Sequence, residues 1–322
     1  MIKELHFAII FLLIFCFSGF GNTNQFKMLR HKNFLIKYEL NSEKLALDVR
    51  SLINQNVNRM EEFYNIKSEF TVNIFIVKSP KEFKFYSQSS LPDWTGAAYL
   101  STQDIILLKK PVGEKPKLNF ERDFLHELSH LYFEKKFHGV NIPVWYNEGL
   151  AEYLSGKKID LHSGLILSNA IWAKTIIPLN AIDSLLSFPQ QKAELTYVQS
   201  LSAVLFIKEK LNEPKWHDFQ DVILDKGWPT AFITTLKMDE IDFEISWYKH
   251  IVDKYRWLFI LNVENLIWIL LLLVLALGMY LVRNRNKKLL KKWEFEEEIY
   301  GYRNSNFSEP ESDFTDLSKK EE

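Results

Sequence analysis

An uncharged run of 17 apolar residues at positions 266–282, LIWILLLLVLALGMYLV, constrains the fold of this chain more than any other feature. A helix of this length just meets the hydrocarbon thickness of a bilayer. Trp268 and Tyr280 stand near its two ends, where amphipathic rings prefer the membrane interface. The alternative is a buried core helix, and the abrupt basic flank that follows argues against it. We therefore expect a single transmembrane helix at 266–282.

The charges around this run predict its orientation. Six basic residues follow it, whereas the preceding flank is mixed in charge. The positive-inside rule then places the C-terminus in the cytoplasm. Residues 283–322 are a basic flank and a polar tail, which we expect to be unstructured from Trp293 onward.

The N-terminus carries a second apolar segment, FAIIFLLIFCFSGF, at positions 7–20. Lys3 precedes it, and Gly19 and Gly21 follow at the spacing that a signal peptidase favours, which predicts a signal peptide over 1–21. An uncleaved N-terminal anchor is the alternative. Either outcome leaves a domain over 24–256 on the outer side of the cytoplasmic (inner) membrane, in a single-pass protein.

The composition excludes several classes of function. The formal net charge is -1 and no long basic run occurs outside the membrane flank, so we expect no nucleic-acid partner. The single cysteine, Cys16, lies in the predicted signal peptide. The mature domain therefore has no disulfide and no cysteine metal ligand, and any metal site must use His, Asp or Glu.

Hydrophobic periodicity predicts an α+β fold for the outer domain. We expect a small mixed β-sheet lobe, then a helix that carries an HExxH motif, then a mainly helical C-terminal lobe before the transmembrane helix. The predicted strands are 34–38, 70–77 and 104–109; the predicted helices are 43–63, 80–87, 119–136 (capped by Asn119) and 143–155; 91–98 is a predicted loop.

The HExxH motif reads HELSH at 126–130. On a helix, His126 and His130 are one turn apart and project from one face, so both imidazoles can bind one zinc ion. Glu127 lies beside them, close enough to reach a water molecule on the metal. It would accept the proton of that water and pass it to the leaving group.

The segment PVWYNEGLAEYLSG at 143–156 supplies further carboxylates. Glu148 would complete a set of three ligands, the number that a catalytic zinc usually takes from the protein. Glu152, one turn further along, could accept the second ring N–H of a ligand histidine and fix its tautomer. In the alternative interpretation both glutamates belong to a solvated helix face.

Together, HELSH and the segment WYNEGLAEY resemble the gluzincins, and the peptidase MA-like proteins most closely; the second segment is also similar to the aminopeptidase N family. The resemblance implies that His126, His130 and Glu148 bind Zn²⁺ and that Glu127 is the general base. It also implies that strand 104–109 is a sheet edge to which an extended peptide could add.

The sequence departs from the aminopeptidases at one point. Aminopeptidases of that family have a segment with a glutamate that binds the free amine of the substrate. The comparable segment here is GAAYL, at 96–100, and it contains no acidic residue. Aminopeptidase activity is therefore not expected. The family also places a Tyr or His to stabilise the oxyanion, and Tyr197 is the candidate, although an aromatic residue at this spacing also fits a core position.

These features predict a membrane-anchored zinc metallopeptidase that hydrolyses peptide bonds of peptide or protein substrates. One alternative is a catalytically inactive membrane scaffold or sensor with a structural or vestigial metal site. Glu127 argues against it, because a retired site often loses its general base. Another alternative is zinc-assisted hydrolysis of a non-peptide bond, which the motif alone does not exclude.

Overall fold

The computed structural model describes residues 26–87, 91–92, 95–111, 117–182 and 188–305. The chain divides into two compact units, Met1–Phe259 and Ile260–Glu322. The predicted signal peptide over 1–21 lies outside the described residues.

A five-stranded mixed sheet forms one side of the first unit, with strand order β1-β2-β3-β5-β4. Strands β2, β3 and β5 run parallel to one another, and β1 and β4 pair antiparallel at the two edges. The bounds are β1 Lys27–His31, β2 Phe34–Tyr38, β3 Val72–Val77, β4 Ala97–Leu100 and β5 Ile105–Lys109. The expected α+β class with a mixed sheet is confirmed.

The order of the strands corrects one expectation and refines another. Strand β5, expected at 104–109 as a sheet edge, lies between β3 and β4. The edge next to it is β4, which begins at Ala97 inside the segment expected to be a loop. Ala97 and Ala98 carry no β-branched or aromatic side chain, so local propensity does not indicate a strand there. The pairing with β5 makes this segment a strand.

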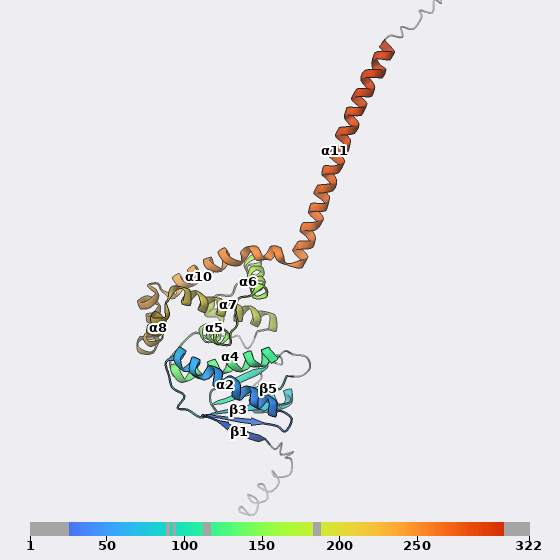
Figure 1. Ribbon diagram of the computed structural model, residues 1–322. Helices are drawn as coiled ribbons and strands as arrows, with labels where there is room; N and C mark the ends of the chain where they lie inside the picture. Colours follow the sequence, from blue (N-terminus) through green and yellow to red (C-terminus); the bar gives the residue numbers. More distant parts are fainter. Residues whose placement is uncertain (1–25, 88–90, 93–94, 112–116, 183–187, 306–322) are drawn as a thin grey trace, which may run out of the picture. The chain divides into compact units, whose positions relative to one another are not determined.

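Two helices cover one face of the sheet, as Figure 1 shows: α2 (Glu43–Tyr64) and α4 (Lys117–Phe137). The inward-facing residues of β2, Phe34, Ile36 and Tyr38, are buried in the core that includes residues of both helices. The opposite face packs against the shorter helix α3 (Pro80–Ser87). Helix α4 begins before the expected cap, so Asn119 lies inside its first turn.

The helical lobe follows α4 in the chain and packs on its far side from the sheet (Figure 1). Its elements are α5 (Val144–Leu154), α6 (Leu161–Ala173), α7 (Gln190–Lys210), α8 (Glu213–Lys226), α9 (Trp228–Ala231), η2 (Phe232–Leu236), α10 (Glu240–Tyr255) and η3 (Arg256–Leu261). Trp145, Trp216 and Trp247 are almost fully buried within this lobe. These large aromatic side chains account for much of the area that holds the helices together.

Helix α11 (Val263–Ser305) makes up most of the second unit. Over Leu266–Tyr300 it is long and apolar enough to cross a membrane. Its most apolar window of 18 residues has a mean hydropathy of 2.5, and none of that window is buried in the protein. The expectation of an unstructured tail from Trp293 is wrong up to Ser305, because the helix continues. In this part of the helix, Lys292 Nζ lies 3.5 Å from Glu296 Oε1, and an ion pair at this i,i+4 spacing stabilises a helix.

Candidate metal centre and cleft

Helix α4 presents His126 and His130 on the side facing the helical lobe, toward Glu148 of α5. Its opposite side is anchored by Phe124, Leu128 and Leu131, which are fully buried. The Ser129 hydroxyl adds a hydrogen bond of 2.8 Å to the Tyr64 hydroxyl of α2, inside the core. The apolar stripe and this bond set the rotation of the helix, and with it the direction of both histidines.

Three ligand-type atoms converge between α4 and α5. Nε2 of His126 and Nε2 of His130 lie 3.0 Å apart, and Oε2 of Glu148 lies 3.4 Å and 3.6 Å from them, respectively. Tetrahedral ligands at about 2.0–2.1 Å from a zinc ion are separated by about 3.3 Å from one another. The three atoms therefore have the spacing that such an ion requires. This is the one cluster of its kind among the described residues.

The buried carboxylate of Glu148 gives a second test of this fit. Its Oε2 is buried and makes no hydrogen bond with any of the described residues. Burial by itself would raise the pKa of Glu148, but the adjacent imidazoles, His130 first, hold that pKa well below its usual range. An ionised oxygen without a hydrogen-bond donor, aimed at two ring nitrogens, matches the donor set of a metal site.

Two polar side chains of α5 hold the two imidazoles. Nδ1 of His130 lies 2.9 Å from Oδ1 of Asn147, so its N–H donates to the amide oxygen and Nε2 is left toward the cluster. Nδ1 of His126 lies 3.4 Å from Oε1 of Glu152, the carboxylate expected to fix the tautomer of a ligand histidine. Glu152 in turn pairs with Lys157 at 2.6 Å. Asn147 directly precedes Glu148, but no spacing rule in the sequence assigns a role to it.

The same carboxylates change the acidity of the rings. Burial disfavours a charged imidazole, yet Glu148 and Glu152 outweigh it and raise the pKa of His126 well above its usual value. Glu148 does the same for His130, whose pKa is also raised. Without a metal, both imidazoles therefore keep a second ring proton to a higher pH than an ordinary histidine does.

Glu127 points to the sheet side of the cluster. Its Oε2 accepts a hydrogen bond of 2.7 Å from the backbone N–H of Tyr99, on edge strand β4. The second carboxylate oxygen, Oε1, is not used in this bond. The contact fixes the carboxylate between the histidine cluster and the strand.

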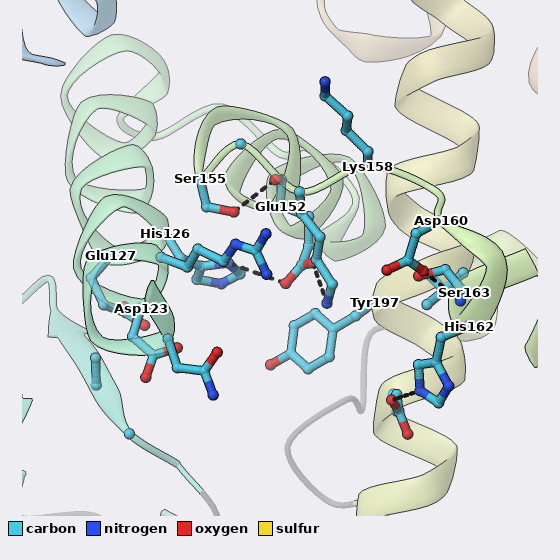
Figure 2. Close-up of a pocket in the computed structure, with 18 of the residues that line it drawn as sticks. Asp123, His126, Glu127, Glu152, Ser155, Lys158, Asp160, His162, Ser163 and Tyr197 are labelled. Atoms are coloured by element: carbon cyan, nitrogen blue, oxygen red, sulfur yellow. Dashed lines mark hydrogen bonds and ion pairs between the residues drawn. The ribbon is translucent and has the colours of Figure 1, made fainter. Parts of the chain in front are cut away.

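A cleft of about 980 Å³ opens beside the cluster (Figure 2). Figure 2 shows Asp123, His126 and Glu127 on one side, Glu152 and Ser155 at the centre, and Tyr197 with α6 on the other side. A smaller cavity of about 280 Å³ continues past His130 and Glu148. His126, Glu127 and Tyr197 line both spaces, so the cluster stands where they meet.

Tyr197 extends from α7 into this cleft. Its ring centroid lies 5.9 Å from that of His126, in an edge arrangement. Burial, followed by the charges of Glu148 and Glu127, raises the pKa of Tyr197 well above its usual value, so the hydroxyl stays protonated and able to donate. The candidate chosen from sequence thus lies beside the cluster.

The close contact between α5 and α7 depends on Gly149. A Cβ added there would lie 2.7 Å from the carbonyl carbon of Ser200 and would also meet the side chain of Val204. The absence of a side chain allows α7 to lie against the helix that carries Glu148 and Glu152. Tyr197 can reach the cluster because of this approach.

The other histidines among the described residues lie away from the cluster. His138 is exposed and pairs with Glu134. His162 lies on the cleft wall, 3.1 Å from Glu194, which the sequence did not indicate. His162 comes to the cleft through the packing of α6, and no spacing in the sequence signals that contact.

A comparison with known families gives a match over most of the first unit. The family model described as the Peptidase MA superfamily matches residues 53–252, well over half of the chain. The matched region includes α4, α5 and α7, and so every residue of the cluster and Tyr197. A search of curated proteins finds no matching relative.

Proposed function

The chain belongs to the Peptidase MA superfamily and is a metallopeptidase, and on this premise we propose that it hydrolyses peptide bonds with a zinc ion held by His126, His130 and Glu148. The convergence of Nε2, Nε2 and Oε2 within 3.6 Å of one another is the observation that carries the proposal. When bound, zinc lowers the pKa of a coordinated water and polarises the substrate carbonyl.

Glu127 is the general base in this proposal. Because Tyr99 N–H occupies Oε2, the proton is accepted at Oε1. The protonated carboxyl group then donates to the nitrogen of the leaving amine. The Tyr99 bond holds the carboxylate in one orientation through both transfers, which limits the reorganisation needed in the transition state.

Asn147 and Glu152 act as positioning residues. Each accepts the Nδ1–H of one imidazole, so both rings direct Nε2 to the metal. Tyr197 donates its hydroxyl proton to the oxygen that gains negative charge when the carbonyl is attacked. The raised pKa of Tyr197 supports this role, since an ionised phenolate could not donate.

An extended peptide would add to edge strand β4. In an antiparallel pair, alternate residues direct their N–H and C=O groups away from the partner strand. Tyr99 N–H bonds to Glu127, so Tyr99 and Ala97 are the residues whose polar groups face outward from β5. Ala97 also lines both cavities, and its main chain is available to pair with substrate there.

Membrane anchoring is part of the same proposal. The domain over 24–256 lies outside the cytoplasmic membrane, 266–282 crosses it, and 283–322 lies in the cytoplasm. The wholly exposed apolar window of α11 supports this arrangement, because such a surface is not stable in water. The basic residues that follow 282 support the orientation.

Zinc content is the first test. We expect one zinc ion per chain in the full-length protein purified in detergent, and a loss of that zinc in His130→Ala with the fold retained by circular dichroism. The absence of zinc from both well-folded proteins would contradict the proposal and favour the scaffold interpretation. Zinc-loaded parent should then cleave unstructured polypeptide, and Glu127→Gln should not.

A further inference from the structure

Helix α6 belongs to two surfaces at once. At its N-terminal end, Asp160, His162 and Ser163 line the cleft. At its C-terminal end, the ring of Trp172 packs on Phe259, with centroids 4.4 Å apart. The helix has 13 residues, so its two ends are separated by about 20 Å along its axis.

The last residues of the first unit are fixed to this helix. Ser168 Oγ and Trp172 Nε1 both donate to the carbonyl of Arg256, at 3.1 Å and 2.6 Å. A Cβ on Gly164 would lie 2.7 Å from Cδ1 of Leu258, so the glycine lets the leucine side chain lie close to α6. Segment η3 therefore cannot move away from α6 without breaking these contacts.

The connection to the apolar helix is short. Residues 260–265 alone separate Phe259 from Leu266, where the candidate span begins. A fully extended chain covers about 3.5 Å per residue, which gives about 25 Å for this connection. The length of α6 and the length of this connection add up to less than about 50 Å. The end of α6 that lines the cleft therefore lies within roughly 50 Å of Leu266, whatever the angle between the two units.

The surface at this point has the composition of a membrane interface. Trp172 and Trp257 have 53% and 58% of their surface exposed, although both are large aromatic residues. The guanidinium of Arg256 lies 4.6 Å from the Trp257 ring, and Lys254 is exposed nearby in the chain. Tryptophan rings favour the headgroup region, and basic side chains favour anionic lipid. We call these four residues the juxtamembrane patch.

We propose that the substrates are peptide segments held close to the membrane surface, an inference that rests on the proposed function. The juxtamembrane patch contacts lipid headgroups in this proposal. The patch and the short connection keep the cleft near the bilayer. Segments that extend from membrane-anchored proteins are then at high effective concentration, whereas peptide bonds far from the bilayer are out of reach.

The test uses the full chain in liposomes of phosphatidylcholine and phosphatidylglycerol. A library of fluorogenic extended peptides is attached to lipid through either a short flexible spacer or a rigid helical spacer of about 80 residues, which spans about 120 Å. We expect the short-spacer library to be cleaved about tenfold faster or more in liposomes, and both libraries equally in detergent. Equal cleavage in liposomes would overturn the inference and leave the peptidase intact.

Failure of the proposed function has a different signature. If neither library is cleaved in detergent, and the parent equals Glu127→Gln, the peptidase proposal fails and this inference fails with it. An insertion of a helical spacer of about 60 residues after Asn262 should allow cleavage of the long-spacer library, since it adds about 90 Å of reach. An unchanged preference in this insertion variant would overturn the limit set by the connection.

The lipid contact has its own variant. Trp257→Ser should lower cleavage of the short-spacer library in liposomes severalfold and leave the rate in detergent unchanged. Phe85→Ser replaces an aromatic residue of α3 that is 75% exposed and should change neither rate. Parent-like cleavage by Trp257→Ser in liposomes would exclude the patch as a lipid contact.

Discussion

Oε2 of Glu127 accepts a hydrogen bond of 2.7 Å from the backbone N–H of Tyr99. This bond joins the helix that bears the histidine pair to the edge strand on which a peptide would lie. The strand that aligns the substrate therefore also aligns the proposed base. An amide oxygen can accept the same bond, so a glutamine at position 127 should keep the geometry and lose only the basicity.

Glu127→Gln should retain zinc and lose hydrolysis by about 10²- to 10⁴-fold in kcat, because the proton acceptor is removed while the Tyr99 contact remains. Metal analysis and turnover on unstructured polypeptide measure the two effects. Glu121→Gln, on the same helix but outside both cavities, is the matched control and should behave like the parent. Equal turnover by Glu127→Gln and the parent would rule out this base.

Glu148→Ala should weaken zinc binding more than Glu152→Gln does. The first removes a direct ligand, whereas the second removes a group that orients His126 and should cost about 10- to 100-fold in affinity. Competition with a chelator gives both affinities. Glu209→Ala, at an exposed carboxylate, serves as control. An affinity unchanged in Glu148→Ala would mean that the third ligand lies elsewhere.

Zinc binding should release protons, and its affinity should rise with pH. Glu148 and Glu152 raise the pKa of His126 in the metal-free protein, and zinc binds only the neutral ring. Glu148 contributes no proton, since its pKa is lowered and it is already ionised. Titration calorimetry in two buffers of different ionisation enthalpy, at about pH 6.5, should give different heats. Identical heats would contradict this linkage.

The same shifts predict how the stability of the metal-free protein depends on pH. A raised imidazole pKa stabilises the fold below the ordinary histidine pKa of about 6.5, and this contribution is lost as pH rises through the raised value. Zinc should offset the loss, because it binds the neutral rings and keeps a positive charge beside the carboxylates. Thermal unfolding of the apo and zinc-bound forms across this range measures the difference.

Tyr197→Phe should lower kcat by about 10²-fold and leave zinc affinity and KM nearly unchanged. The ring still packs beside His126, and only the hydroxyl that donates to the oxyanion is lost. Tyr153→Phe, which removes a hydroxyl from α5 outside both cavities, is the control. A variant Tyr197→Phe with full kcat would place Tyr197 among the packing residues.

Gly149→Ala should destabilise the fold by about 1–3 kcal/mol, since the new methyl group would push the Ser200 carbonyl and Val204 away. Differential scanning calorimetry should show a lower Tm, and kcat should fall as α7 and Tyr197 shift. Gly278→Ala adds the same group where nothing lies within 4 Å and should leave the Tm unchanged. A Tm equal to that of the parent in Gly149→Ala would show that the helices separate without cost.

The local geometry of the site could be predicted from the sequence because helical periodicity decides it. His126 and His130 share a face by spacing alone, and the structure groups Glu148 with them. The roles of these residues stay predictions. The pairing of β4 could not be foreseen, because Ala97 and Ala98 become a strand only through contact with β5.

Contacts between segments that are far apart in the sequence could not be predicted either. His162 reaches the cleft wall through the packing of α6, and Asn147 meets His130 only once α5 docks on α4. Hydrophobic patterns predict which face of each helix is buried, but they do not predict which other element packs against that face. The strand order has the same origin, since a run such as 104–109 reads alike at an edge and inside a sheet.

The metal cluster and the cleft wall differ in contact order. The cluster comes from two successive helices, with His130 and Asn147 only 17 positions apart, so little loop entropy opposes its closure. The cleft also requires Gly149 of α5 to lie against Ser200 of α7, and these two residues are much farther apart in the sequence. Contacts between residues that are close in the sequence form earlier in folding than contacts between residues that are far apart in the sequence. We expect the nascent protein to be able to bind its metal before its cleft can receive a peptide, which separates metal loading in time from the onset of proteolysis.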